Sequence, residues 1–171
     1  TDDIVEMKLD GDIKILKDGS DKTIQAKAVI LAMGSAYREI GLENEKRLSG
    51  RGVSWCATCD GFFFREKEIA VVGGGDSAME EANFLTRFGR KVTVIHRRDS
   101  LRASKIMAER AMANSKIEFL WNTEVIDVLG GDNLSGLKLR NTVDGTVSER
   151  NFDGLFVAIG HIPRSELVAN Q

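Results

Sequence analysis

The sequence is poor in proline, cysteine and long apolar runs. Its 171 residues include one proline, two cysteines, two histidines and one tyrosine. No apolar stretch approaches the roughly 20 residues that cross a bilayer, and the chain does not open with a charged start, an apolar stretch and a cleavage site. Two cysteines are too few for a disulfide scaffold. We therefore expect a cytoplasmic protein with no membrane partner.

Neither positive nor negative charge is in clear excess. The chain carries 24 Lys plus Arg against 26 Asp plus Glu, a formal net charge of -2. This balance argues against a general basic face for nucleic acid, so any anion site must be local. Hydrophobic residues make up 42% and charged residues 29%, which is typical of a compact globular protein and not of a disordered one.

Hydrophobic periodicity predicts an α/β fold. Alternation over Ile4–Leu16 and Thr23–Ala26 indicates an antiparallel ribbon, and the continuous apolar run Ala28–Met33 is typical of a strand buried on both faces. We expect further strands at Glu68–Val72, Lys91–His96, Ile117–Trp121, Glu124–Leu129, Leu134–Asn141 and Leu155–Ile159, and helices at Asp76–Phe88 and Ser104–Asn114. The series predicts a Rossmann-like, mostly parallel sheet with an added antiparallel ribbon.

A glycine-rich turn joins one of these strands to its helix. The residues Gly73, Gly74, Gly75, Asp76, Ser77 and Ala78 fit G-x-G-x-x-A. In this motif the first glycine allows a tight turn, the second lets the backbone approach a pyrophosphate, and the small last residue permits close packing of helix on strand. The helix N-terminus adds free N–H groups and a positive dipole end. The pattern predicts a dinucleotide site, and the alternative is a glycine turn with no ligand.

The next strand ends in a basic cluster. About 20 residues beyond the glycine turn, an NAD-binding domain places an acid for the ribose 2′-OH. This sequence instead has His96, Arg97 and Arg98, with Arg102 shortly after. Three guanidiniums attract a 2′-phosphate and can pair with it through bidentate hydrogen bonds. The cluster therefore predicts NADPH over NADH, and a solvated basic face is the alternative.

The two cysteines, Cys56 and Cys59, are three residues apart. This spacing lets two thiols close a small disulfide ring, and in a cytosolic protein it favours redox exchange over a structural staple. Asp60 follows directly and is a candidate acid/base for the exchange. Two alternatives stay open. One is a zinc site with His96 and His161, although these histidines lack finger spacing, and the other is a reduced pair that merely packs.

Four motifs together resemble one family. CATCD from Cys56, GGGDSA from Gly73, HRRDSLR from His96 and FVAIGH from Phe156, in that order and spacing, are similar to the low-molecular-weight thioredoxin reductases. The resemblance covers essentially the whole chain. It implies an NADPH-dependent flavoprotein that passes electrons through FAD and a cysteine pair to thioredoxin, and that works as a homodimer.

The resemblance also implies roles for single residues. Cys59 is similar to the thiol nearest the flavin, Cys56 to the interchange thiol that attacks thioredoxin, and Asp60 to the acid/base. The glycine turn from Gly73 to Ala78 matches the NADPH pyrophosphate loop. Arg97, Arg98 and Arg102, with His96 beside them, match the family's 2′-phosphate clamp. Gly160 and His161 match a crossover back to the flavin domain. No metal site is expected.

We expect three segments along the chain. Residues 1–48 are expected to belong to an FAD-binding domain, 49–158 to form the NADPH-binding domain with the cysteine pair, and 159–171 to start a second FAD-domain segment. The glycine loop and the later Gly-Asp segment with which whole family members hold FAD are not found in this sequence, so we expect this stretch to be inactive by itself. The alternatives are an NADP-binding module without turnover and a reductase that serves a peroxidase-type acceptor.

Overall fold

The computed structural model describes residues 3–169 and divides the chain into two compact units. We call Tyr37–Gly160 the central unit, and the residues before and after it the flanking unit. None of the helices in residues 3–169 has the length and apolarity that crossing a lipid bilayer requires.

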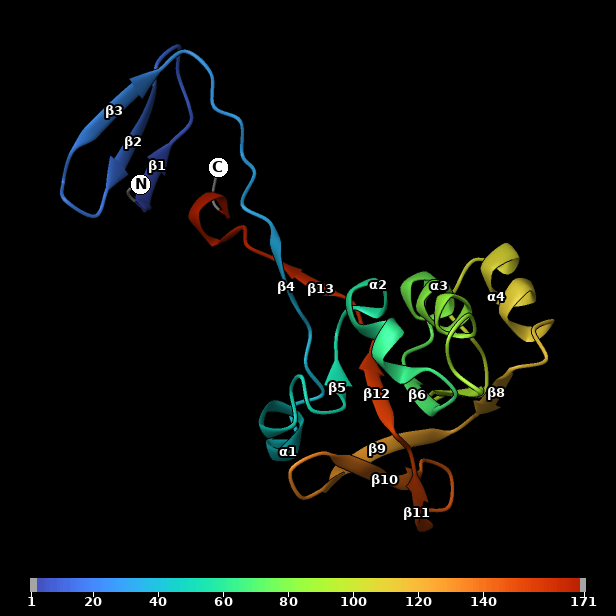
Figure 1. Cartoon of the computed structure of the whole chain (residues 1–171). Helices are drawn as coiled ribbons and strands as arrows, with labels where there is room; N and C mark the ends of the chain where they lie inside the picture. The colour runs from blue at the N-terminus through green and yellow to red at the C-terminus, as the bar shows by residue number, and fades with distance from the viewer. Residues whose placement is uncertain (1–2, 170–171) are drawn as a thin grey trace. The chain divides into compact units, whose positions relative to one another are not determined.

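A five-stranded parallel sheet forms the middle of the central unit (Figure 1). Its strands lie side by side in the order β5 (Val53–Ser54), β12 (Gly154–Val157), β6 (Glu68–Val72), β7 (Lys91–Ile95) and β8 (Ile117–Leu120). Side chains alternate along a strand, so Ile69 and Val71 of β6 enter one core while Ala70 enters the other. Both faces of the sheet are therefore covered, which explains its continuous apolar runs. The predicted parallel sheet is confirmed.

Helices cover one face of this sheet (Figure 1). Helix α3 (Asp76–Leu85) packs beside α4 (Lys105–Met112), and both end earlier than the sequence pattern predicts. Ala78, Ala82 and Leu85 of α3 are fully buried in the core beneath the helices, because small and apolar groups recur there at helical spacing. The short helix α2 (Ala57–Asp60) and the 3₁₀ helix η1 (Gly61–Phe64) complete this layer.

An antiparallel sheet covers the opposite face of the parallel sheet (Figure 1). It consists of β11 (Val147–Asn151), β10 (Leu134–Asn141) and β9 (Thr123–Gly130) in that order, and helix α1 (Glu43–Arg47) contacts β9. The sequence pattern does not indicate β11, since its residues read Val-Ser-Glu-Arg-Asn without apolar alternation. Its pairing with β10 defines it as a strand.

An ion network joins the two sheets. The Glu118 Oε2 atom on β8 lies 2.7 Å from Arg150 Nη2 on β11 and 2.7 Å from Lys91 Nζ on β7. The hydrogen bonds from Arg150 and Lys91 lower the pKa of Glu118 to about 2. This carboxylate is therefore charged at neutral pH and ties the edge strand of the parallel sheet to the antiparallel layer.

The flanking unit contains the predicted antiparallel ribbon, in which β1 (Ile4–Lys8), β2 (Lys14–Asp18) and β3 (Thr23–Ala26) lie side by side. The remaining elements are β4 (Ser35–Tyr37), whose last residue counts with the central unit, its partner strand β13 (His161–Pro163), and the 3₁₀ helix η2 (Glu166–Val168). The strand predicted at Ala28–Met33 is wrong, because this run has no regular structure and Ile30 is 94% exposed. A strand needs hydrogen-bonded neighbours, and none of the described strands pairs with this run.

Candidate nucleotide and disulfide sites

The glycine turn lies between β6 and α3, at the carboxyl end of a central strand. A Cβ atom added at Gly73 would stand 2.7 Å from the Ala78 Cβ and would overlap the Ala158 carbonyl oxygen. The backbones around β6, α3 and β12 therefore approach one another only because this residue is glycine. Gly75 is different, since an added Cβ would meet no atom within 4 Å. The protein itself leaves the space over Gly75 open.

An open cavity of about 690 Å³ lies at this edge of the sheet, and all of its lining residues belong to the central unit. Its size suits a small-molecule ligand. The glycine turn from Gly73 to Ser77 forms one side, and the basic segment after β7 forms another. The crevice at the carboxyl ends of parallel strands is where open α/β sheets bind their ligands.

Three arginines, Arg97, Arg98 and Arg102, line this cavity together with the glycine turn. The backbone holds them there, because the N–H groups of Arg102 and Ala103 both donate to the Gly74 carbonyl oxygen, at 2.7 and 3.0 Å. The three side chains are permanent cations, and the first N–H groups of α3 add donors at the same place. The arrangement can bind a ligand with separate phosphate groups.

His96 is buried between the glycine turn and the basic segment, with 7% of its surface exposed. Its ring occupies the space that a Cβ of Gly74 would need, and its Nε2 lies 3.0 Å from the Ser100 carbonyl oxygen. Burial lowers the pKa of His96, with help from the charges of Arg98 and Arg97 and against the hydrogen bond to Ser100. The imidazole is therefore neutral at physiological pH.

A further wall of the cavity, Arg38–Ile40, was missed by sequence reasoning. Glu45 fixes the backbone at the end of this wall. Its carboxylate accepts hydrogen bonds from the N–H groups of Ile40 (3.0 Å), Gly41 (2.8 Å) and Leu42 (3.2 Å). Glu45 is fully buried, so these three donors replace its hydration. The sequence signal for this role is weak. Glu45 stands at the third position of α1, as in a capping box, but the residue before the helix is Leu42 instead of the usual Ser, Thr, Asp or Asn.

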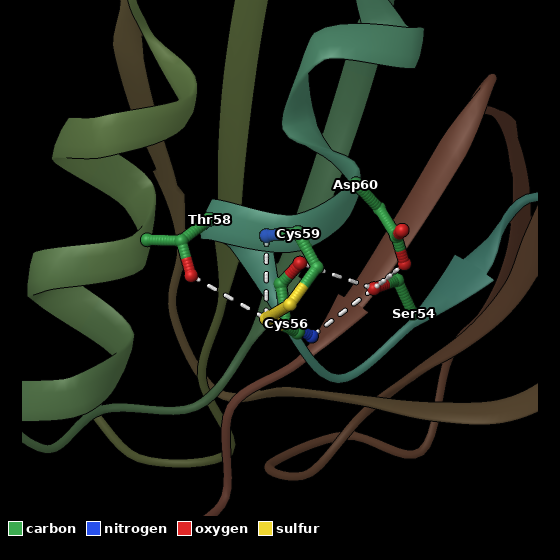
Figure 2. The surroundings of a disulfide bond; sticks show 5 residues. All are labelled: Ser54, Cys56, Thr58, Cys59 and Asp60. Carbon is green, nitrogen blue, oxygen red and sulfur yellow. Dashed lines mark hydrogen bonds between the residues drawn. A yellow bond between two sulfur atoms is a disulfide. The ribbon is translucent and has the colours of Figure 1, made fainter.

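Cys56 and Cys59 form a disulfide at the start of α2, with their Cα atoms 5.3 Å apart (Figure 2). Figure 2 shows Asp60 turned toward Ser54, whose hydroxyl donates to Asp60 Oδ2 at 2.7 Å. The Cys56 N–H donates to the same Ser54 oxygen at 3.1 Å. Ser54 is 4% exposed and ends β5, so it couples the sheet edge to both the disulfide and the carboxylate. Sequence reasoning missed Ser54.

The structure does not bring all the predicted site residues together. Those that line the cavity are Gly73, Gly74, Gly75, Asp76, Ser77, His96, Arg97, Arg98, Arg102 and Gly160. Ala78 lies in the core below the turn, and His161 begins β13 in the flanking unit. Cys56, Cys59 and Asp60 belong to the central unit but do not line the cavity. Among residues 3–169 no group of three or more His, Cys, Asp or Glu is arranged to hold a metal ion.

A dinucleotide-type cavity and a C-x-x-C disulfide in one α/β unit define a class of protein, the nucleotide-linked disulfide oxidoreductases. Comparison with known proteins agrees with this class. A family model described as pyridine nucleotide-disulphide oxidoreductase matches residues 3–171, and the chain belongs to this family.

Similar proteins are thioredoxin reductases, as the sequence resemblance predicts. The chain is 58% identical to one from Streptomyces coelicolor, over 99% of this chain and 53% of the relative. It is 55% identical to the bifunctional thioredoxin reductase/thioredoxin of Mycobacterium leprae, over 99% of this chain and 37% of the relative. The crystal structure of the Lactococcus lactis thioredoxin reductase (FR conformation) matches with a TM-score of 0.88 and 40% identity, over 98% of this chain and 55% of that one. The chain thus spans about half the length of several curated relatives it matches.

Proposed function

We propose that this chain is the NADPH-binding and disulfide-bearing part of a flavoprotein that reduces thioredoxin. One observation carries the proposal: a single compact unit holds both the Cys56–Cys59 disulfide and an arginine-lined cavity over a glycine turn. Family membership supports it, and so does the similarity to thioredoxin reductases.

NADPH is the nucleotide that the cavity residues fit. The open space over Gly75 lets a pyrophosphate come close to the backbone, where the N–H groups at the start of α3 would donate to it. Arg97, Arg98 and Arg102 would surround the 2′-phosphate, which NADH lacks. Each charge-assisted hydrogen bond to that phosphate is worth about 1.5 to 3 kcal/mol, so even one favours NADPH by about tenfold or more.

Cys56 would be the attacking thiol once the disulfide is reduced. The Cys59 N–H lies 3.3 Å from Cys56 Sγ and the Thr58 hydroxyl 3.4 Å, and both donors favour a thiolate there. The Cys56 thiolate attacks one sulfur of the thioredoxin disulfide, forms a mixed disulfide and releases the other sulfur as a thiolate. Cys59 then attacks Cys56, restores the Cys56–Cys59 disulfide and frees the second thioredoxin thiolate. Asp60, held by Ser54, is the candidate for moving protons during these steps.

Bound FAD would take hydride from NADPH and pass two electrons to the disulfide. We propose that the segments expected at 1–48 and 159–171 belong to the domain that holds FAD, around the nucleotide domain at 49–158. Gly160 and His161 would then be the crossover between the two. Residues 37–48 are part of the compact central unit, so this end of the first segment would also serve the nucleotide, through Arg38–Ile40.

The test uses the full protein that contains this chain, supplied with FAD, NADPH and a thioredoxin. Cys56→Ser should abolish thioredoxin reduction and leave flavin reduction by NADPH intact. The matched variant Cys59→Ser should also lose turnover, but its Cys56 should be trapped in a mixed disulfide with thioredoxin, seen on a non-reducing gel. Turnover by Cys56→Ser, or wild-type turnover as fast with NADH as with NADPH, would refute the proposal.

A further inference from the structure

The segment that carries the three arginines is irregular. From His96 to Ser104 the chain forms neither helix nor strand, between the end of β7 and the start of α4. A segment of this kind with three long cations is mobile unless other contacts hold it, and ordering it costs conformational entropy. An ordered phosphate clamp therefore needs specific contacts that fix the segment before a ligand arrives.

Two contacts outside the glycine turn hold Arg97 and Arg98. The Arg97 carbonyl oxygen accepts from the Thr142 hydroxyl at 3.2 Å, and the Arg98 carbonyl oxygen accepts from the Asn122 N–H at 3.0 Å.

Contacts with the glycine turn hold both ends of the segment. Near its start, the buried His96 ring packs on Gly74 and its Nε2 contacts the Ser100 carbonyl oxygen. Near its end, Arg102 and Ala103 donate to the Gly74 carbonyl oxygen, and the Ser104 N–H donates to Asp76 Oδ1 at 2.6 Å. The last contact is the one that depends on a side chain of the phosphate loop itself.

Asp76 is an unexpected residue for a phosphate loop. It lines the cavity at the first position of α3, where its negative charge would repel a pyrophosphate. Its carboxylate is nevertheless well placed for another purpose, because its Oδ1 accepts from the residue that directly precedes α4. The first residue of one helix thus anchors the entry to the next.

We propose that Asp76 is a positioning residue that latches the end of the segment, residues 102–104, onto the glycine turn and so holds Arg102 at the 2′-phosphate. The inference rests on the proposed function, since it takes NADPH as the ligand. Asp76 acts through Ser104 and the backbone, since its own charge would repel the phosphates. The preference for NADPH is then set partly by a residue that does not touch the group being recognised.

Three variants test this inference, one that keeps the hydrogen bond between Ser104 and Asp76 and two that remove it. Asp76→Asn keeps an Oδ1 acceptor for the Ser104 N–H and removes the charge, whereas Asp76→Ala removes the acceptor. Ser104→Pro removes the donor from a residue outside the cavity lining, and its φ of -56° suits proline. Thermal unfolding of each variant identifies any that fails to fold.

Trypsin reports the order of the segment without any nucleotide, because it cleaves after Arg97, Arg98 and Arg102. In the full protein we expect cleavage after Arg102 to be about tenfold faster in Asp76→Ala and Ser104→Pro, and unchanged in Asp76→Asn. Cleavage after Arg97 and Arg98 should change less, because Thr142 and Asn122 hold these residues in every variant. Calorimetric titration should show NADP⁺ affinity about tenfold weaker in Asp76→Ala and Ser104→Pro, and NAD⁺ affinity within about threefold of wild type in both. Asp76→Asn should bind NADP⁺ at least as tightly as wild type.

Each outcome decides a separate point. Wild-type cleavage rates in Asp76→Ala would overturn the latch, and so would an Asp76→Asn variant that behaves like Asp76→Ala. Faster cleavage with equal losses for NADP⁺ and NAD⁺ would overturn the role in nucleotide preference. A wild-type protein without any preference for NADP⁺ would contradict the proposed function instead, and the trypsin comparison would still decide the latch.

Discussion

Three successive glycines in the turn after β6 serve three different purposes. Gly73 lets the chain pass close to the Ala158 carbonyl and Ala78, and Gly74 makes room for the His96 ring. Both are required by the fold, because a side chain at either position would overlap protein atoms. Gly75 meets nothing within 4 Å and has a φ of -96°, which any residue can adopt. The fold therefore does not require a glycine at position 75, and a ligand that approaches the backbone there is the use we propose for it.

Gly75→Ala therefore separates ligand binding from folding. We expect its melting temperature to stay at the wild-type value and its NADP⁺ affinity to fall by about tenfold or more, because the new methyl group takes the space of the pyrophosphate. Isothermal titration and thermal unfolding measure the two effects. Gly74→Ala is the matched control, and it should lower the melting temperature as well, since its Cβ meets His96. Wild-type NADP⁺ affinity in Gly75→Ala would mean that the turn does not hold the nucleotide.

The parts of the site that could be predicted are those encoded within a few consecutive residues. The glycine turn, the cysteine pair and the arginine cluster are of this kind, because their chemistry depends on local spacing. Ser54, Glu45 and Arg38 could not be found this way. Glu45 binds backbone groups of a loop, Ser54 bridges two elements, and Arg38 reaches the cavity only through the tertiary fold.

At the scale of elements, strand prediction succeeded where an apolar run of residues also has neighbouring strands to pair with. β6 and β7 are apolar runs between paired strands, and they were predicted. Ala28–Met33 is equally apolar but has no neighbouring strand among residues 3–169, so hydrophobicity alone misled the prediction. For β11 the error is the opposite one. Its polar sequence does not predict a strand, but it forms one because it pairs with β10. Pairing is a tertiary property that periodicity does not report.

Helix α3 carries a carboxyl group that its surroundings disfavour as an anion. Glu81 Oε2 is buried without a hydrogen-bond partner in the described structure, and burial, with the charge of Glu80, raises the pKa of Glu81 to about 7. In the unfolded chain this group loses its proton near its ordinary value of 4.5. Between these two values folding takes up a proton, so the contribution of Glu81 to stability falls as pH rises and levels off above the folded value.

Glu81→Gln should therefore stabilise the protein at pH 8 and have little effect at pH 4.5. The shift in pKa, discounted because the group is partly exposed, suggests a gain of about 1 to 2 kcal/mol at pH 8. Thermal or urea unfolding at the two pH values measures it, and Glu80→Gln on the same helix is the control, with a smaller expected change. A Glu81→Gln variant that is equally stabilised, or destabilised, at both pH values would contradict the assignment.

At the scale of the whole molecule, two tasks of the proposed reductase have candidate residues in the central unit, nucleotide binding and disulfide exchange. Because the chain spans about half the length of its curated relatives, turnover has to be measured on the full protein. A third task, docking of a protein substrate, would be favoured by an exposed apolar surface close to the disulfide. The segment directly after the disulfide has one, since Phe62 and Phe63 of η1 are 58% and 70% exposed.

Replacing both phenylalanines should weaken thioredoxin docking and spare the nucleotide site. Burial of one exposed Phe side chain in an interface is worth about 1.5 to 3 kcal/mol, so the double variant Phe62→Ser, Phe63→Ser should raise the KM for thioredoxin by about tenfold or more. Flavin reduction by NADPH should keep its wild-type rate, because neither residue lines the cavity. Ile106→Ser is the control, since Ile106 is 78% exposed but lies on α4, outside the segment that carries the disulfide. An unchanged KM in the double variant, or an equal rise in Ile106→Ser, would place the docking surface elsewhere.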